Sequence, residues 1–477
     1  MPHSPLRDYQ VAAVDDARLA IAEGCRSLIL ESPTGSGKSL MIRDMAERAA
    51  RKGFSSYVVA PRREIISQMS RHYDEVGLDH GILQADHPRR RPGYPIQIAT
   101  TATLLRRDVP EPSIIFRDEA HLGLQATLTL RERFPNAIFI GTTATPCRLD
   151  GRPLGSAFQR IIRVATVADL IQRGYLCPYV AFQPPWDIDL SSIPTMGGDY
   201  HRHKLAARVA RPSLTGDAVA TWLEKAEGRS TIVFCVDVAH MTMARDQYRA
   251  KGVDARMVHA KTPDAERDKL IAEFSAGVFP ILCNVEIATY GLDVPRTACI
   301  QILRPTQSVA IWMQMQGRGL RIFPGKRDLL LLDHAGMSLI PEFGLPDDPH
   351  EWTLEGGHVK RKTTEATISI RRCGKCFRLA RAGTAICPHC GTPFPIYHRP
   401  IIQRAGELQQ ATRARPALCP EAPDEQRVRT AARWFREAAK RQYKNQDGWV
   451  KARYMAVFGR WMDPETERKA RVGSGSV

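Results

Sequence analysis

Eight residues decide the fold of this 477-residue chain: Ser32-Pro33-Thr34-Gly35-Ser36-Gly37-Lys38-Ser39. They follow the apolar run 28–30 and precede a segment with a helical pattern, which is the strand, loop and helix layout of a P-loop. Glycines let backbone N–H groups close around phosphate oxygens, and the helix N-terminus adds positive potential. We therefore expect Lys38 to reach the β- and γ-phosphates of a nucleotide and Ser39 to hold magnesium. The other expected nucleotide contacts in the loop are Thr34, Gly35, Ser36 and Gly37. Ser32 stands where this pattern usually has its first glycine.

An acidic pair lies further along the chain. The apolar run 113–116 is typical of a strand, and it ends in Arg117-Asp118-Glu119-Ala120-His121. Beside a P-loop, such a pair at the C-terminal end of a strand predicts a site for magnesium binding and water activation. Asp118 would bind the metal through a water molecule, and Glu119 would orient and deprotonate the attacking water. The alternative is a solvated charged turn.

Further segments follow in an order that resembles superfamily 2 helicases of the DEAD/DEAH type. These segments are Arg7-Asp8-Tyr9-Gln10, 60–64, 99–104, 141–146, 284–295 and 314–321. The resemblance implies an α/β fold of two RecA-like parallel-sheet lobes in tandem, with ATP between them and a nucleic-acid strand across both. It also implies that Gln10 and Arg7 contact the adenine, that Gly291 and Asp293 contact the nucleotide, and that Thr101 contacts the strand.

The spacing Gln-x-x-Gly-Arg-x-x-Arg over 314–321 marks two arginines of the second lobe. By the same resemblance, Arg318 and Arg321 would reach across the cleft to the γ-phosphate, where an arginine stabilises charge that develops in the transition state. The alternative is a pair of surface charges on a helix. Thr143 and Thr145 lie in the segment that the resemblance assigns to coupling hydrolysis with movement.

Segments of the second lobe narrow the resemblance to one family within superfamily 2. Segments 283–295, 302–306, 317–326 and 332–336 closely resemble RadD-type bacterial DNA repair helicases, over roughly residues 1–340. Asp118-Glu119-Ala120-His121 differs from the cysteine-containing form of that family, and the basic tail differs as well. A phage or prophage helicase of similar build fits equally well.

Four of the eleven cysteines form two pairs, Cys373-Gly374-Lys375-Cys376 and Cys387-Pro388-His389-Cys390. Four thiolates in two such knuckles hold Zn²⁺ tetrahedrally and leave no open catalytic position. We therefore expect a structural zinc ribbon with Cys373, Cys376, Cys387 and Cys390 as ligands. A redox pair or a coincidence is the alternative.

The net charge of +17 is concentrated at the end of the chain. Residues 358–477 hold 25 Lys and Arg against 10 Asp and Glu, a net +15, whereas residues 1–357 carry only +2. On a helix expected over about 426–445, one face would carry Arg429, Arg433, Arg436, Lys440 and Lys444. The opposite face would carry Val428, Ala431, Phe435, Ala438 and Ala439. This pattern predicts contact with a nucleic-acid backbone. A solvated surface and a protein-binding tail are the alternatives.

These observations predict the following order: a first lobe (1–150), a connection (151–215), a second lobe (216–345), a zinc ribbon (366–397), a linker (398–424) and a basic helical tail (425–477). No apolar run approaches the ~18–20 residues that would span a membrane. Because the chain also starts without a signal-peptide pattern, we expect it in the bacterial cytosol or nucleoid, or encoded by a phage.

The expected activity is that of an ATP-dependent DNA helicase or translocase that uses ATP, Mg²⁺ and Zn²⁺. Its partner would be single-stranded or branched DNA, in repair, recombination or phage replication. Two alternatives stay open at this point. One is an RNA-directed DEAH-type ATPase, and the other is a non-enzymatic zinc and basic-tail module that binds nucleic acid beside an inactive motor.

Overall fold

The computed structural model forms two compact units, residues 1–395 and residues 396–477. The residues that it describes are 6–60, 63–84, 87–147, 153–183, 193, 195–196, 199–200, 204–205, 212–285, 292–340, 342–355, 370–381, 383–394, 422–440 and 445–474. None of the helices in these ranges combines the length and apolar composition that a bilayer crossing requires.

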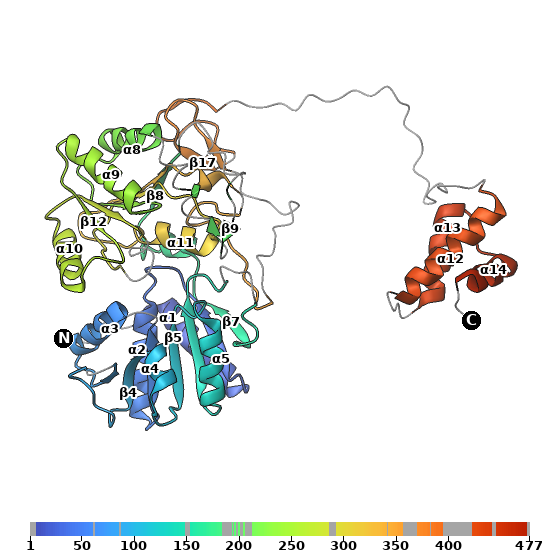
Figure 1. The fold of residues 1–477 in the computed structure, drawn as a ribbon, viewed down its shortest axis with the longest axis horizontal. Helices are drawn as coiled ribbons and strands as arrows, with labels where there is room; N and C mark the ends of the chain where they lie inside the picture. Colours follow the sequence, from blue (N-terminus) through green and yellow to red (C-terminus); the bar gives the residue numbers. More distant parts are fainter. Residues whose placement is uncertain are drawn as a thin grey trace. The chain divides into compact units, whose positions relative to one another are not determined.

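A seven-stranded parallel sheet forms the first lobe, drawn in blue to teal in Figure 1. Its strand order is β3-β4-β2-β5-β6-β1-β7. The strands are β1 (Ser27–Glu31), β2 (Ser56–Ala60), β3 (Gly81–Leu83), β4 (Ile96–Thr100), β5 (Ile114–Asp118), β6 (Ile138–Thr143) and β7 (Arg160–Arg163). The helices are α1 (Asp8–Ala22), α2 (Lys38–Arg51), α3 (Arg63–Glu75), α4 (Thr101–Arg106) and α5 (Leu124–Arg133).

A six-stranded parallel sheet forms the second lobe, with the strand order β12-β13-β11-β14-β15-β8. The strands are β8 (Tyr179–Phe182), β11 (Thr231–Phe234), β12 (Ala255–Val258), β13 (Ile281–Asn284), β14 (Cys299–Ile302) and β15 (Leu329–Asp333). The helices are α8 (Pro212–Lys225), α9 (Val238–Ala250), α10 (Asp264–Ala276), α11 (Val309–Gly317) and the short 3₁₀ helix Met337–Leu339. The two-residue strands β9 (Thr195–Met196) and β10 (Asp199–Tyr200) form a separate hairpin.

The central strands are almost entirely buried because helices cover both faces of each sheet. β2 and β15, for example, are buried at every position. The expected fold class of two tandem parallel-sheet lobes is confirmed. The polar residues of the expected site follow the carboxyl ends of strands, which is where open parallel sheets bind their ligands.

The segment expected to connect the lobes, 151–215, does more than connect. β7 pairs with β1 of the first sheet, and β8 pairs with β15 of the second. Each is an edge strand that pairs with one neighbour of its sheet. Of the described residues, 164–178, with the short helix α6 (Val167–Gln172), lie between these two strands.

The cysteine-rich segment packs against the second lobe. Its strands β16 (Ile370–Arg372) and β17 (Leu379–Arg381) form an antiparallel hairpin. Arg378 pairs with Phe182 at the end of β8, and the rings of Phe182 and His389 lie 5.5 Å apart, edge to face. Because Leu379 also joins the core of the motor, the ribbon does not form an independent unit.

The described residues of the C-terminal unit form the helices α12 (Asp424–Lys440), α13 (Gln446–Phe458) and α14 (Pro464–Ser474). Its core is aromatic, with Trp434, Phe435, Tyr454 and Phe458 buried. The expected apolar face of the first helix is wrong in part. Ala439 is exposed and Val428 is half-buried, whereas Arg427, Ala432 and Trp434 are buried. The core-facing side is rotated because α14 also packs against α12, where Ala432 meets Gly473.

Candidate functional site

The P-loop connects β1 to the first residue of α2. Ser32 is fully buried, and its Oγ lies 2.5 Å from the Oγ of Ser36. The Ser36 hydroxyl in turn donates to the carbonyl of Pro33 at 2.6 Å. A hydroxyl pair thus closes the loop at the position where the usual pattern has its first glycine.

Glycine is required at the end of the loop. Gly37 caps α2 with φ at +84°, and a Cβ there would lie 2.4 Å from Nε2 of Gln10. Gln10 donates from Nε2 to the carbonyl of Ser36 at 2.8 Å, and the Tyr9 hydroxyl donates to the same carbonyl at 2.8 Å. The Arg7 backbone N–H donates to Gln10 Oε1 at 2.8 Å. The expected base-contacting residues Arg7 and Gln10 therefore lie directly beside the loop.

The acidic pair faces the P-loop lysine. Nζ of Lys38 lies 3.5 Å from Oε1 of Glu119, and both side chains are little exposed. Asp118 accepts a 2.9 Å hydrogen bond from Thr142. Glu119 has φ at +48°, a left-handed conformation that is uncommon outside glycine and concentrates at functional sites. Ser39 lies in the first turn of α2, next to Lys38.

The surroundings shift the pKa values of the two carboxyl groups in opposite directions. Burial, followed by the charge of Glu119, raises the pKa of Asp118. Burial also opposes ionisation of Glu119, but the positive charges of Lys38 and Arg318 outweigh it and hold the pKa of Glu119 below its usual value. Glu119 is therefore kept as a carboxylate, which is the form that accepts a proton.

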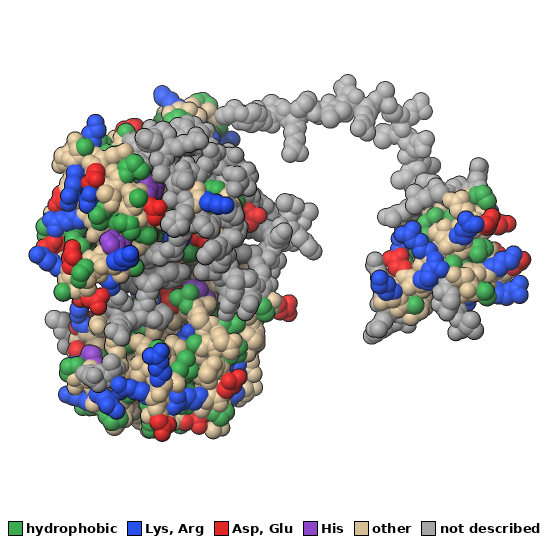
Figure 2. Space-filling view, in the orientation of Figure 1, with side chains coloured by type: hydrophobic (Ala, Val, Ile, Leu, Met, Phe, Trp, Pro, Cys, Tyr) green, Lys and Arg blue, Asp and Glu red, His purple; other side chains and the backbone are tan. Residues whose placement is uncertain are grey.

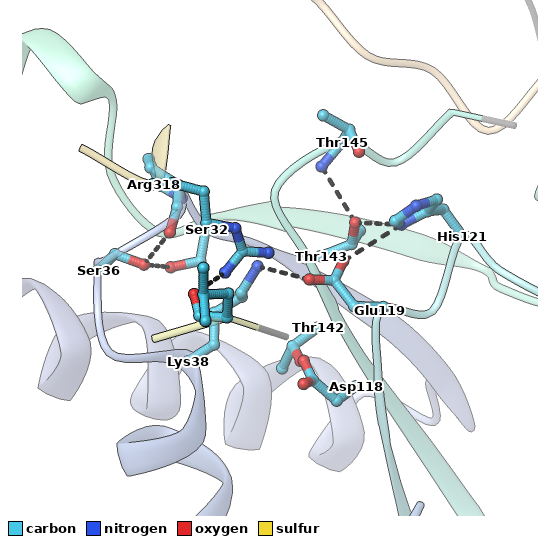
Figure 3. Close-up of polar contacts among 12 residues, drawn as sticks. Ser32, Ser36, Lys38, Asp118, Glu119, His121, Thr142, Thr143, Thr145 and Arg318 are labelled. Carbon is cyan, nitrogen blue, oxygen red and sulfur yellow. Dashed lines mark hydrogen bonds and ion pairs between the residues drawn. The ribbon is translucent and has the colours of Figure 1, made fainter. Parts of the chain in front are cut away.

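His121 joins the acidic pair to the following strand, as Figure 3 shows. Its Nδ1 lies 2.7 Å from Oγ1 of Thr143 and 3.5 Å from Oε2 of Glu119. The Thr145 backbone N–H donates to the same Thr143 hydroxyl at 3.0 Å. Burial lowers the pKa of His121 to about 4, so the imidazole is neutral at pH 7. The sequence interpretation gave His121 no role, although it stands in the quoted motif.

The C-terminal end of α11 in the second lobe packs against the P-loop. A Cβ on Gly317 would lie 2.6 Å from Cβ of Thr34, and a Cβ on Gly35 would lie 3.1 Å from Cγ of Arg321. Arg318 is 7% exposed and donates to the Leu292 carbonyl at 2.9 Å. In Figure 3 its guanidinium group faces the side of the cleft that holds Lys38.

Arg321 pairs within the second lobe. Its Nη1 lies 2.7 Å from Oδ1 of Asp293, while Gln68 of the first lobe donates to Oδ2 of Asp293 at 3.2 Å. The structure thus brings Asp293, Arg318 and Arg321 to one edge of the cleft. Gly291, which was expected to contact the nucleotide, lies outside the described residues.

A groove with a volume of about 1580 Å³ runs between the lobes. Its lining includes Thr101, Arg71 and Arg106 from the first lobe, and Arg267 and Asp293 from the second. Thr101 is the first residue of α4 and accepts a 3.0 Å hydrogen bond from Arg117. The expected strand-contacting residue therefore lines a groove with cations from both lobes.

The four ribbon cysteines converge. Their sulfur atoms all lie within 4.8 Å of one another, with 3.6 Å between Cys373 and Cys390 and between Cys376 and Cys387. Tetrahedral Zn²⁺ with bonds of about 2.3 Å requires sulfur separations of this order. The cluster is therefore compatible with a four-cysteine zinc site.

The expected basic face of the tail is exposed on α12. Arg429, Arg433, Arg436 and Lys440 all point away from the core, and Figure 2 shows Lys and Arg side chains gathered on the visible face of this unit. Arg429 pairs with Glu425 at 2.6 Å, and Arg436 donates to the Gly473 carbonyl at 2.7 Å. Lys444 lies outside the described residues.

Two family profiles match the chain. The family described as type III restriction enzyme, res subunit, matches residues 3–148, and the helicase conserved C-terminal domain matches residues 215–323. The first match spans the P-loop and the acidic pair. The second match includes Arg318 and Arg321.

Relatives with similar sequences come from a phage and from yeasts. A 51.5 kDa protein of a Lactococcus phage is 29% identical over 77% of this chain and 78% of its own length. The Saccharomyces cerevisiae protein IRC3, named as a proposed ATP-dependent helicase, is 26% identical over 72% of this chain. Its Schizosaccharomyces pombe namesake, named as mitochondrial, is 29% identical over 69%. The chain spans just over half the length of these two yeast proteins, 53% and 57%.

Solved structures agree on the fold. A fragment of a proposed HsdR subunit of a type I restriction enzyme from Vibrio vulnificus superposes with a TM-score of 0.56, at 22% identity, over 72% of this chain and 67% of its own. A type ISP restriction-modification enzyme bound to DNA gives 0.51, at 16% identity, over 71% of this chain and 28% of its own. These structures share the fold, while the family matches and the relatives place the chain in superfamily 2 of the helicases, a family of ATP-hydrolysing enzymes.

Proposed function

We propose that the chain is a nucleic-acid-stimulated ATPase that moves along or unwinds DNA. The observation that carries the proposal is the cleft in which Lys38 and Glu119 of the first lobe lie near Arg318 of the second. Groups from both lobes act on one reaction only when the lobes are close together. Hydrolysis can therefore be made to depend on a strand that lies across both.

The resting contacts indicate how the residues would act. The γ-phosphate of ATP would take Lys38 away from Glu119, because a phosphate carries more negative charge than one carboxylate. Glu119 would then be free to accept the proton of the attacking water, with His121 Nδ1 lying 3.5 Å from its second oxygen. Arg318, already in the cleft, would stabilise the charge that develops on the transferred phosphoryl group.

Two metal ions belong to the proposal. Ser39 and Asp118 would hold Mg²⁺, which neutralises phosphate charge when it is bound. Cys373, Cys376, Cys387 and Cys390 would hold Zn²⁺, and their closed thiolate set supports a structural role.

DNA as the polymer rests on two supports. One is the likeness in fold to a restriction-modification enzyme that was solved bound to DNA. The other is the basic face of α12, where Arg433, Arg436 and Lys440 are exposed and suit a phosphate backbone. We keep RNA as the first alternative because phosphate contacts serve both polymers.

A non-enzymatic nucleic-acid-binding module is the second alternative, and the cleft argues against it. An inactive motor has no use for a carboxylate kept ionised beside the P-loop lysine. A role in repair, recombination or phage replication stays part of the proposal, as does a site of action in the bacterial cytosol.

ATP turnover with four polymers tests the proposal: single-stranded DNA, duplex DNA, forked DNA and RNA. We expect stimulation by single-stranded or forked DNA and weak stimulation by RNA. Stronger stimulation by RNA would favour the first alternative. No turnover with any polymer, at an ATP concentration that saturates binding, would favour the second.

A further inference from the structure

Residues 343–355, here called the strap, leave the second lobe and lie against the first. The root of the strap is fixed to α11. Trp312 donates from its indole N–H to the Gly344 carbonyl at 2.9 Å, and Gln316 donates to the same carbonyl at 3.3 Å. Since Arg318 caps this helix, the strap begins on the element that carries the catalytic arginine.

The far end of the strap contacts the first lobe through its backbone and an apolar side chain. The Gly155 N–H donates to the Leu354 carbonyl at 2.8 Å. The Leu354 side chain packs on a cluster that includes Ile29 of β1 and Ala120, the residue after Glu119. The strap therefore ends on the framework that holds the P-loop and the acidic pair.

Between these ends the strap contacts the last residue of β1, directly before the P-loop. That residue is Glu31, and Arg163 of β7 donates from Nε to its carboxylate at 3.0 Å. Arg163 also donates from Nη2 to the His350 carbonyl of the strap at 2.9 Å. The Trp352 side chain hydrogen-bonds to Glu31 and stacks on the His350 ring, with 5.6 Å between ring centroids.

The ribbon holds the middle of the strap. Arg381 of β17 pairs with Asp347 at 2.6 Å and also with Asp348. Asp348 accepts a 2.7 Å hydrogen bond from the Leu345 N–H, which fixes the turn of the strap. A hairpin whose loop carries Cys373 and Cys376 is thus attached to the segment that contacts both α11 and β1.

We propose that the strap is a second tie between the lobes and that it couples the ribbon to the nucleotide site. Nucleotide affinity depends on the spacing between the P-loop and α11, since both border the cleft. The strap sets this spacing by a route separate from residues 164–178. Arg163, Trp352 and Arg381 are then positioning residues. The inference rests on the proposed function, since it concerns regulation of the same ATP site.

Two matched pairs of variants test the tie in the full chain. Arg163→Gln removes the hydrogen bond to the strap and the ion pair with Glu31, while Arg160→Gln, on the same strand, removes an exposed pair with Glu23. Arg381→Gln releases the strap from the ribbon, while Arg378→Gln removes the same charge elsewhere on the ribbon. We expect Arg163→Gln and Arg381→Gln to weaken ATP and ADP binding roughly 5-fold, measured by calorimetry, and both controls to match wild type.

Turnover and hydrogen exchange separate positioning from chemistry. Because the variants lose binding shared by ground and transition states, KM for ATP should rise while kcat stays within about twofold. Amides of 27–39 and 343–355 should exchange faster in both variants and not in the controls. Trp352→Phe, which keeps the ring and loses the indole N–H, should give a smaller change in the same direction, and it serves as the test if Arg163→Gln does not fold.

Each outcome tests a different part of the proposal. Wild-type affinity and exchange in Arg163→Gln would overturn the tie. A wild-type-like Arg381→Gln beside an altered Arg163→Gln would overturn the role of the ribbon. A wild-type chain that does not bind ATP would contradict the proposed function instead, and hydrogen exchange would still decide whether the strap holds the lobes.

Discussion

The cations of the motor and those of the C-terminal unit are placed in opposite environments. In the motor, Lys38 is 12% exposed and paired with Glu119, and Arg318 is 7% exposed. On α12, Arg433 and Lys440 point into solvent, opposite an aromatic core. Burying a charge is costly unless a partner compensates for it, so the motor cations are fixed by their own acids and backbone carbonyls. Exposed cations instead suit a nucleic-acid backbone, which presents phosphates in many positions.

This contrast separates two tasks. Cations held in one fixed geometry suit a single reaction, and substituting them should abolish catalysis. Cations on an open face contribute additively and depend on salt, and their loss should weaken binding in small steps. The variants below change one region at a time.

The largest effect is expected from Arg318→Ala. Arginine groups at a transferred phosphoryl group contribute about 10³–10⁵ in rate. We expect turnover to fall by that order, with ATP binding reduced much less. Phosphate release and ATP binding should be measured on the same sample. Arg327→Ala, an exposed arginine of the same lobe, is the control. A loss confined to ATP affinity would place Arg318 outside the chemical step.

Glu119→Gln should come next. It keeps the shape of the side chain and removes the base, which is worth about 10²–10⁴ in rate. ATP should still bind, because the charge near Lys38 becomes less negative. Glu132→Gln, exposed in the same lobe, should behave as wild type. Near-normal phosphate release from Glu119→Gln would assign the base to another residue.

Gly317→Ala probes the contact between the lobes. The added Cβ would lie 2.6 Å from Cβ of Thr34, so α11 must move away from the P-loop. Overpacking of this kind corresponds to roughly a 10-fold loss, here in ATP affinity. Gly93→Ala, where a Cβ would meet open space, is the control. Equal affinities in the two variants would mean that the lobes bind ATP without this contact.

The ribbon cysteines lie in a segment that packs with the motor. Cys373→Ser combined with Cys376→Ser should release one zinc ion per chain, measured by elemental analysis. We expect the melting temperature to fall by several degrees, since Leu379 belongs to the motor core. Cys25→Ser is the control. A purified, untagged wild-type chain without zinc would contradict the metal assignment.

The smallest effect per residue is expected on α12. Reversing Arg433, Arg436 and Lys440 to Glu should weaken DNA binding and reduce the logarithmic salt slope by about 0.7–0.9 for each lost phosphate contact. Basal turnover should not change. A control with the same charge change reverses three exposed cations of the motor, Arg18, Arg48 and Arg51. If both triple variants lose the same affinity, net charge and not this face is responsible.

Local motifs made much of the motor predictable. The P-loop and the acidic pair each lie within a few residues, and their chemistry follows from strand-to-loop order. Lys38 and Glu119 are found together because both follow parallel strands that end at one edge of the sheet. The cysteine pairs are equally local, and they converge as their spacing predicts.

Contacts between distant segments were not predictable. Nothing local to Ser32 indicates that Ser36 will close the loop with it. The strap depends on Arg163 meeting His350, which lies 187 residues away in the sequence. On α12, helical periodicity gave the exposed arginines correctly but missed the burial of Trp434, whose ring packs against Phe458 of α13.

In the proposed mechanism the cleft performs the reaction, and nucleic acid bound elsewhere controls it. A titration of ATP turnover with single-stranded DNA tests this most directly, using wild type, Glu119→Gln and the α12 triple reversal. We predict that the triple reversal reaches the wild-type maximum at a higher DNA concentration and that Glu119→Gln stays inactive at every concentration. Wild-type turnover that ignores DNA, or a triple reversal with a lower maximum at an unchanged DNA requirement, would contradict the account.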